Sequence, residues 1–309
     1  MAELFRKLKK KFKRSREKES LGSLLLSYLI LIGIGFIYLY PILYMICNSF
    51  MSELDLSDPS VTWIPKSLSL DNFKAAFVTL DFVKSFRNSL IMSFIPALLQ
   101  TVSASVIGYG FAKFSFPLKK LWLAFIVATF LFPSQFFFVP RYAMYHSMNI
   151  LNTVFPSYLP ALFGQGIRSA IFILVFYMFF TSYPKAYDEA AKIDGANSIM
   201  LYRKIALPMS RSAIVLTYLF SLVWYWNETN ESTLYFGQKI ATLPMQLANF
   251  AAKYSDIFGR DDAIDTVSKM TAAIPLSGTF LSVLPLVLIY ILLQRQFVES
   301  IERVGITGE

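Results

Sequence analysis

The chain alternates between long apolar runs and short polar connections along most of its length. A helix needs roughly 20 residues, at about 1.5 Å each, to cross a bilayer core about 30 Å thick. Several runs reach this length with almost no charged residue, so the pattern predicts an all-α membrane protein with six transmembrane helices. The predicted spans are about residues 24–48, 88–112, 121–140, 166–182, 212–236 and 274–293.

Two connections depart from this simple alternation. Residues 141–165 include nearly all of NTVFPSYLPALFGQG, whose prolines and glycines are too frequent for a regular span, so we expect an outer or partly re-entrant segment. Residues 183–211 are polar and helix-prone although they lie between two apolar runs. They predict two short helices joined by a turn at Gly195, with Asn197 or Ser198 capping the second.

The composition agrees with a membrane protein, because 55% of the residues are hydrophobic and only 16% are charged. The mean hydropathy is +0.51. The single cysteine, Cys47, lies in an apolar run and cannot form an intrachain disulfide. The single histidine, His146, has no cysteine or carboxylate neighbours at ligand spacing, so no metal site is expected.

The net charge of +9 is unevenly placed, and its placement argues for lipid rather than nucleic acid. Nine basic residues lie between Arg6 and Lys18, directly before the first span, which divides the chain into a basic segment (1–20) and a transmembrane domain (21–309). If the N-terminus is inside, the inner segments hold 19 of the 29 basic residues and nine of the 20 acidic ones. The positive-inside rule therefore predicts cytoplasmic N- and C-termini and a cytoplasmic 183–211 connection.

Common catalytic and nucleotide-binding motifs are missing from the sequence. There is no G-x-x-x-x-G-K-[ST], so the chain is not expected to bind ATP through a P-loop. There is also no H-E-x-x-H or G-x-S-x-G, and we expect no enzyme activity. On residue chemistry alone, residues 183–211 could be an interfacial amphipathic loop or a docking element for another protein.

The spacing within that connection resembles a known signature. Glu189-Ala190-Ala191, three residues, Gly195, nine residues, Ile205, one residue and Leu207-Pro208 resemble the EAA motif of ABC importer permeases. The stretches EAAKIDGA, WYWNETNESTLYF, IPKSLSLDNFKAAF and LPLVLIYILLQRQFVESIERVGITGE are similar to the carbohydrate branch of that family. The smaller permease subunit of maltose-type importers is the form that the chain resembles most. It departs in its basic start, its long last outer loop and its tail, which lacks a usual glycine.

The resemblance implies a type I ABC importer permease in the bacterial cell membrane. Its partners would be a second similar permease, two cytoplasmic ATPase subunits and an extracytoplasmic solute-binding protein, and ATP and magnesium would bind to the ATPase subunits. This chain would bind no cofactor. In the implied docking, Glu189 makes a charge contact, Gly195 forms the turn, and Ala190 and Ala191 form a close-packing face. The implied ATPase-docking residues are Glu189, Ala190, Ala191, Asp194, Gly195, Leu207 and Pro208.

A second group of candidates lies at the end of the predicted fifth span. Glu228 and Glu231 are the acids at membrane depth or its edge, where ionisable groups are costly unless they face water or a partner. Aromatic rings beside amides and carboxylates also suit sugars. The candidate substrate-pathway residues are Trp224, Trp226, Asn227, Glu228, Asn230 and Glu231. An alternative is an interfacial aromatic belt whose acids already lie in outer water.

Three functions remain open from the sequence. The first is a permease for a sugar or oligosaccharide, forming half of an ATP-driven translocation pathway. The second keeps the ABC fold but carries a polyamine, phosphate or peptide. The third is an ion-coupled secondary transporter that uses Glu228 or Glu231 as its ion site.

Overall fold

The computed structural model of the chain describes residues 21–184, 186–237, 239–259 and 270–306. Over these residues the structure is helical and has no β-strand, only an isolated antiparallel bridge between Met51 and Leu68. The expected all-α class is therefore confirmed. The basic segment 1–20, the part of the last outer loop at 260–269 and the end of the tail lie outside the described residues, so expectations there stay predictions.

The described chain forms two compact units, the first of which contains residues 21–73 and 271–277. Helix α2 (Leu21–Ser49) covers the whole predicted first span and carries no charged residue. Helix α3 (Glu53–Ser57) follows and is capped by Ser52, whose side chain accepts a hydrogen bond from a backbone amide. The chain then folds back, and the Asn72 amide donates to the Met51 carbonyl at 2.7 Å.

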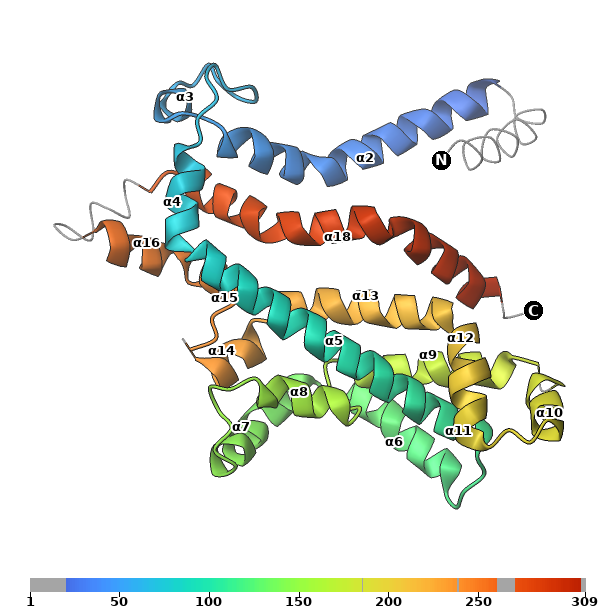
Figure 1. Ribbon diagram of the computed structural model, residues 1–309. Coiled ribbons are helices and arrows are strands. Elements are labelled where there is room, and N and C mark those ends of the chain that lie inside the picture. Colours follow the sequence, from blue (N-terminus) through green and yellow to red (C-terminus); the bar gives the residue numbers. More distant parts are fainter. Residues whose placement is uncertain (1–20, 185, 238, 260–269, 307–309) are drawn as a thin grey trace. The chain divides into compact units, whose positions relative to one another are not determined.

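The second unit contains the described residues within 74–270 and 278–306 and is built around helix α5 (Phe82–Lys113). Helices α8 (Phe155–Leu162), α9 (Ser169–Ser182) and α13 (Arg211–Asn227) pack against α5 (Figure 1). Small residues on α5 allow this close packing. Its buried core includes Ala97, Ala104, Phe172, Phe176 and Leu222.

Shorter helices complete the two units. Helix α4 (Asp71–Thr79) precedes α5, whereas α15 (Leu243–Ala248) and α16 (Phe250–Phe258) follow the polar end of the fifth predicted span. Helix α18 (Ala273–Ile306) is the last one described and extends well beyond the predicted sixth span. Likewise, α5 begins six residues before the predicted second span and carries Lys84 and Arg87 near its start.

Three helices in the described part of the chain are long and apolar enough to cross a membrane: Ser23–Ser49, Phe82–Lys113 and Ala273–Arg295. Three further pairs of helices would each reach that length, but each is bent sharply at a short break. Each of the six predicted spans overlaps one of these three helices or at least one member of a bent pair, and the other members of two pairs lie in the 183–211 connection. A total of six crossings, like the orientation of the termini, stays a prediction.

The predicted third span, 121–140, is not a single straight helix. Helix α6 (Lys119–Leu131) ends before Pro133, and the chain turns by 99° into a 3₁₀ turn and helix α7 (Phe138–Ser147). Phe132 is extended, with ψ of 130°, because proline disfavours the helical conformation of the residue before it. The average hydropathy of a stretch depends only on its side chains, so it does not detect this break in the backbone.

The predicted fifth span, 212–236, extends past the end of the helix that forms most of it. Helix α13 ends at Asn227, Glu228 adopts an extended conformation, and a separate helix α14 (Asn230–Phe236) follows. The Glu228 carboxylate accepts a hydrogen bond from the Glu231 amide at 2.7 Å and so satisfies a free donor at the start of α14.

The irregular character expected for residues 141–165 is confirmed. Helix α8 has eight residues and is flanked by turns, which leaves it too short to cross a bilayer. Gly164, with φ of +71°, and Arg168, with φ of +53°, then redirect the chain into α9.

Candidate functional site

The 183–211 loop folds much as its sequence indicates. Helix α10 (Ala186–Ile193) carries Asp188 and Glu189 in its first turn, where the helix dipole favours anions. Gly195 adopts φ of +80°, a conformation that suits glycine, and its amide closes the turn on the Lys192 carbonyl at 3.0 Å. The predicted two-helix arrangement with a turn at Gly195 is therefore confirmed as local structure.

The second half of the loop begins at Asn197, which caps helix α11 (Ser198–Leu201) by accepting a hydrogen bond from the Met200 amide at 2.8 Å. Asn197 and Ser198 were the two alternatives for this cap, and the structure shows that it is Asn197. The chain continues through a π-helical turn over Tyr202–Ala206 and helix α12 (Leu207–Met209) into α13.

Most of the implied docking residues face outward. Glu189, Ala190, Asp194, Gly195 and Pro208 are exposed in the described structure, and Leu207 is half-buried. Ala191 is only 9% exposed and packs inside the chain itself. The expectation that both alanines form an outward close-packing face is therefore wrong for Ala191, because helical periodicity turns adjacent residues to different sides.

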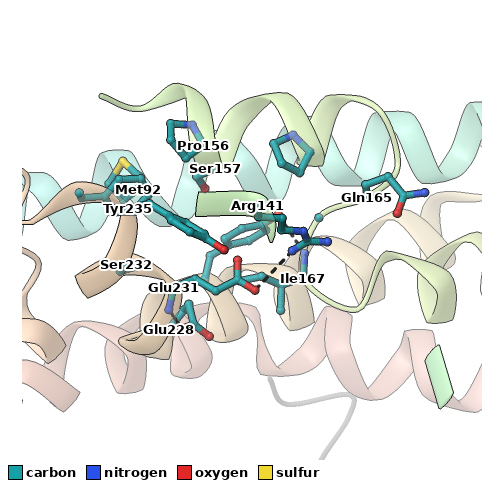
Figure 2. A pocket seen from close by; sticks show the side chains of 14 residues that line it. Met92, Arg141, Pro156, Ser157, Gln165, Ile167, Glu228, Glu231, Ser232 and Tyr235 are labelled. Carbon is teal, nitrogen blue, oxygen red and sulfur yellow. Dashed lines mark hydrogen bonds and ion pairs between the residues drawn. The ribbon is translucent and has the colours of Figure 1, made fainter. Parts of the chain in front are cut away.

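A small polar cavity lies in the second unit, where α14 meets α7 and the chain around α8. Figure 2 shows Arg141 and Glu231 facing one another across it. The Arg141 guanidinium lies 3.5 Å from the Glu231 carboxylate, and both side chains are largely buried. The cavity volume is about 30 Å³, which holds water but is well below the ~300 Å³ at the lower end of ligand pockets.

A buried hydrogen-bond network supports one wall of the cavity. The Gln100 amide donates to the Ile167 carbonyl at 2.9 Å and to the Ser221 hydroxyl at 3.1 Å, and its oxygen accepts from the Tyr225 hydroxyl at 2.8 Å. Gln100 and Ser221 are fully buried. A Cβ on Gly166 would lie within 2.3 Å of both the Gln100 oxygen and the Tyr225 hydroxyl, so any other residue here would displace the two groups that form this network. The network fixes α5, α13 and the chain before α9 together.

The six candidate pathway residues separate in the structure. Glu228 and Glu231 line the cavity, whereas Trp224 packs against Phe172 and lies 4.8 Å from the Arg168 guanidinium. Trp226 is buried, with its ring against Phe86. Asn227 and Asn230 are exposed and do not line the cavity. A pathway role for all six therefore stays a prediction. Of these six residues, the two acids line the cavity.

Sequence reasoning missed Arg141, Gln100 and Tyr225. Gln100 could have been noticed as a polar side chain in the middle of a charge-free span, where such groups seek partners. Arg141 follows Pro140 directly, yet its partner Glu231 is 90 residues away, and no local pattern links the two. Among the described residues, no group of three or more His, Cys, Asp or Glu side chains is placed to hold a metal ion.

Residues 104–303, which contain both the 183–211 loop and the two cavity acids, match the family described as "Binding-protein-dependent transport system inner membrane component". The chain belongs to this family. The match covers 200 of the 309 residues and thus most of the transmembrane domain. The permease is therefore a multi-pass inner-membrane protein.

Several curated proteins are similar to this permease along most of their length. It is 28% identical over 270 residues to Protein LplC of Bacillus subtilis, covering 87% of this chain and 89% of that protein. It is 25% identical over 291 residues to AraQ of Halalkalibacterium halodurans, an arabinooligosaccharides transport system permease protein, covering 92% and 98%. It is 24% identical to AmyC of Thermoanaerobacterium thermosulfurigenes, a probable permease protein for starch degradation products, covering 87% and 92%.

A solved structure shares the fold. A chain of a bacterial ABC transporter involved in import of the acidic polysaccharide alginate superposes with a TM-score of 0.73 at 18% identity, covering 90% of this permease and 99% of that chain. The family and the fold agree that this permease is a subunit of an ABC importer. This excludes an ion-coupled secondary transporter. Such permease subunits are not themselves enzymes, as expected for this chain.

Proposed function

We propose that this permease forms half of the translocation pathway for a sugar or oligosaccharide, and that ATPase subunits drive it by binding the 183–211 loop. The observation that carries the docking part is the exposed first turn of α10, where Glu189 and Ala190 lie free on the surface. Gly195 holds a tight turn directly after this helix. An exposed acid on a short, well-defined helix is a suitable contact for a basic cleft on another protein.

We propose further that the permease acts with a second, similar permease and receives its cargo from an extracytoplasmic solute-binding protein. ATP and magnesium would bind to the ATPase subunits alone. ABC importer permeases in general work with such partners, and this chain has no P-loop motif of its own.

The sugar assignment is supported by what the relatives are named for. These names include starch degradation products, arabinooligosaccharides and polygalacturonan/rhamnogalacturonan. Another relative is named for osmoprotective compounds, so the family does not dictate one cargo. The cavity offers the carboxylates of Glu228 and Glu231 and the guanidinium of Arg141, groups that hydrogen-bond hydroxyls. Because it is only water-sized, a sugar could reach these groups only after the cavity opens.

Charge reversal at Glu189 tests the docking proposal. The permease is co-expressed with the other permease and the ATPase subunits of its own transport system, and the ATPase retained by a tag on the permease is measured. Glu189→Lys should reduce this retention about tenfold or more, because reversing a charge in a contact costs a few kcal/mol. Glu53→Lys is the matched control, since Glu53 is also an exposed acid at the start of a short helix. Equal retention by both variants would contradict the docking proposal.

Uptake by the reconstituted complex tests the cargo. Radiolabelled maltotriose and arabinotriose are compared with putrescine, phosphate and a tripeptide in proteoliposomes that contain the binding protein. We expect uptake of at least one oligosaccharide, with a requirement for internal ATP and no sensitivity to a protonophore. Uptake of only the putrescine, phosphate or tripeptide would overturn the sugar assignment.

A further inference from the structure

The 183–211 loop, which the proposed function assigns to ATPase binding, is attached to helix α5 of the membrane domain. Ser105, Tyr109 and Lys113 lie on α5 at intervals of four residues, which places them along one side of the helix. Each of them contacts the 183–211 loop or the end of α9 that leads into it. In Figure 1 the loop elements α10 and α11 gather at the C-terminal end of α5.

The first attachment is an ion pair to α10. The Lys113 ammonium lies 2.8 Å from the Asp188 carboxylate, and the two side chains are only 15% and 14% exposed. The Tyr183 hydroxyl donates a hydrogen bond to the same carboxylate, and the Lys113 ammonium also lies 3.6 Å from the centre of the Tyr183 ring.

The second attachment holds the returning half of the loop. The hydroxyl groups of Tyr202 and Ser105 are 2.6 Å apart, and the Tyr202 ring lies 5.0 Å from the ring of Tyr109. Tyr109 also contacts Phe180 edge-to-face at 5.3 Å. Tyr202 opens the π-helical turn, a type of distortion that occurs often at functional sites.

The same helix reaches the polar cavity. Met92 on α5 lines the cavity, and Gln100 on α5 is bonded to Ile167 and Tyr225, which also line it. From Lys113 to Gln100 the helix covers roughly 20 Å at about 1.5 Å per residue, and Pro96, the proline inside α5, lies beyond this stretch. A continuous helix is stiff enough to carry a displacement over this distance, and α5 is attached at both ends of it.

We propose that Ser105, Tyr109 and Lys113 transmit movement of the 183–211 loop into α5 and so to the cavity. Lys113 is the central positioning residue, because it holds α10 through Asp188. This inference rests on the proposed function, since it needs nucleotide-bound ATPase subunits to move the loop. Glu189, one residue after Asp188, is exposed and available to the partner while Asp188 is held by α5.

Hydrogen–deuterium exchange of the assembled complex in nanodiscs separates docking from transmission. Exchange is measured with and without AMP-PNP and magnesium, in peptides that cover α10 and residues 105–113. In the wild type, nucleotide should change the exchange rate in both. In Lys113→Met the change in α10 should persist, whereas the change in residues 105–113 should fall about fivefold or more, the lower range of coupling between sites.

Two controls distinguish a loss of transmission in Lys113→Met from a loss of fold or of positive charge. Lys120→Met removes an exposed basic residue from the adjacent helix α6 and should behave as the wild type. Exchanging the pair, with Lys113→Asp and Asp188→Lys together, should restore the response in residues 105–113. The inference is overturned if Lys113→Met keeps that response or if the exchanged pair does not restore it. If wild-type α10 itself does not respond to nucleotide, the proposed function fails, and this inference fails with it.

Discussion

At the scale of single residues, Gly195 shows how a local choice serves the proposed docking loop. Its φ of +80° lies in a region that L-residues with a side chain rarely adopt, and a Cβ there would meet no atom within 4 Å. Any cost of substitution therefore comes from backbone strain and not from a clash. This makes the position a clean test of the turn itself.

Gly195→Ala should strain the turn by about 1 kcal/mol and lower the retention of ATPase subunits by roughly fivefold. Gly195→Asn is the control and should remain close to the wild type, because asparagine enters the left-handed region more easily. Co-purification of the ATPase with the tagged permease measures both variants. Wild-type retention by Gly195→Ala would show that the docking proposal does not depend on this turn.

The ion pair between Arg141 and Glu231 in the cavity, unlike the turn at Gly195, depends on tertiary packing. Glu231 was predicted as a candidate because an acid in that position needs a partner or water. Its partner, Arg141, belongs to α7 and is brought to it only by the packing of α14 against α7. Residue chemistry indicated that a partner should exist, and the tertiary structure supplies its identity.

At the scale of helices, the close approach of α5 and α9 depends on Gly108. A Cβ there would lie 2.6 Å from the Phe176 Cβ and 2.9 Å from the Tyr177 backbone nitrogen. The backbone of α9 cannot yield cheaply, so the two helices would have to move apart. Gly110, two residues later on the same helix, has nothing within 4 Å of its Cβ position.

Gly108→Ala should therefore destabilise the permease by about 1–3 kcal/mol, the usual cost of overpacking. Gly110→Ala should leave its stability unchanged or raise it by up to about 1 kcal/mol, because alanine favours a helix over glycine. Thermal unfolding of the two purified variants in the same detergent compares them directly. If Gly108→Ala unfolds at or above the temperature of Gly110→Ala, the helices are not limited by contact at this position.

Helix boundaries also show where a hydrophobic pattern stops being informative. The first predicted span lies wholly within α2, because a long charge-free run has one simple solution in a bilayer. The third and fifth predicted spans were broken by Pro133 and by the cap that Glu228 provides for α14. Both breaks depend on backbone conformation and hydrogen bonding, to which mean apolarity is insensitive.

At the scale of the whole molecule, the orientation of the chain remains a prediction from its charge distribution. It can be tested with single cysteines in a Cys47→Ala background. Ser60→Cys lies between α3 and α4 and should react with a membrane-impermeant maleimide in intact cells. Ser115→Cys lies between α5 and α6 and should react only after the membrane is opened, because the positive-inside rule places that connection in the cytoplasm. The reverse labelling would contradict the N-in arrangement.

The sequence alone was sufficient to predict an all-α membrane protein, the 183–211 loop with its turn at Gly195, and the resemblance to ABC importer permeases. These features depend on apolar length, on local conformational preference and on residue spacing, all of which act over short stretches of chain. The tertiary structure was needed to break two of the spans, to bury Ala191, and to join Arg141 with Glu231 and Lys113 with Asp188. Those contacts join residues about 75 to 90 positions apart, and only the packing of helices around α5 brings them within bonding distance.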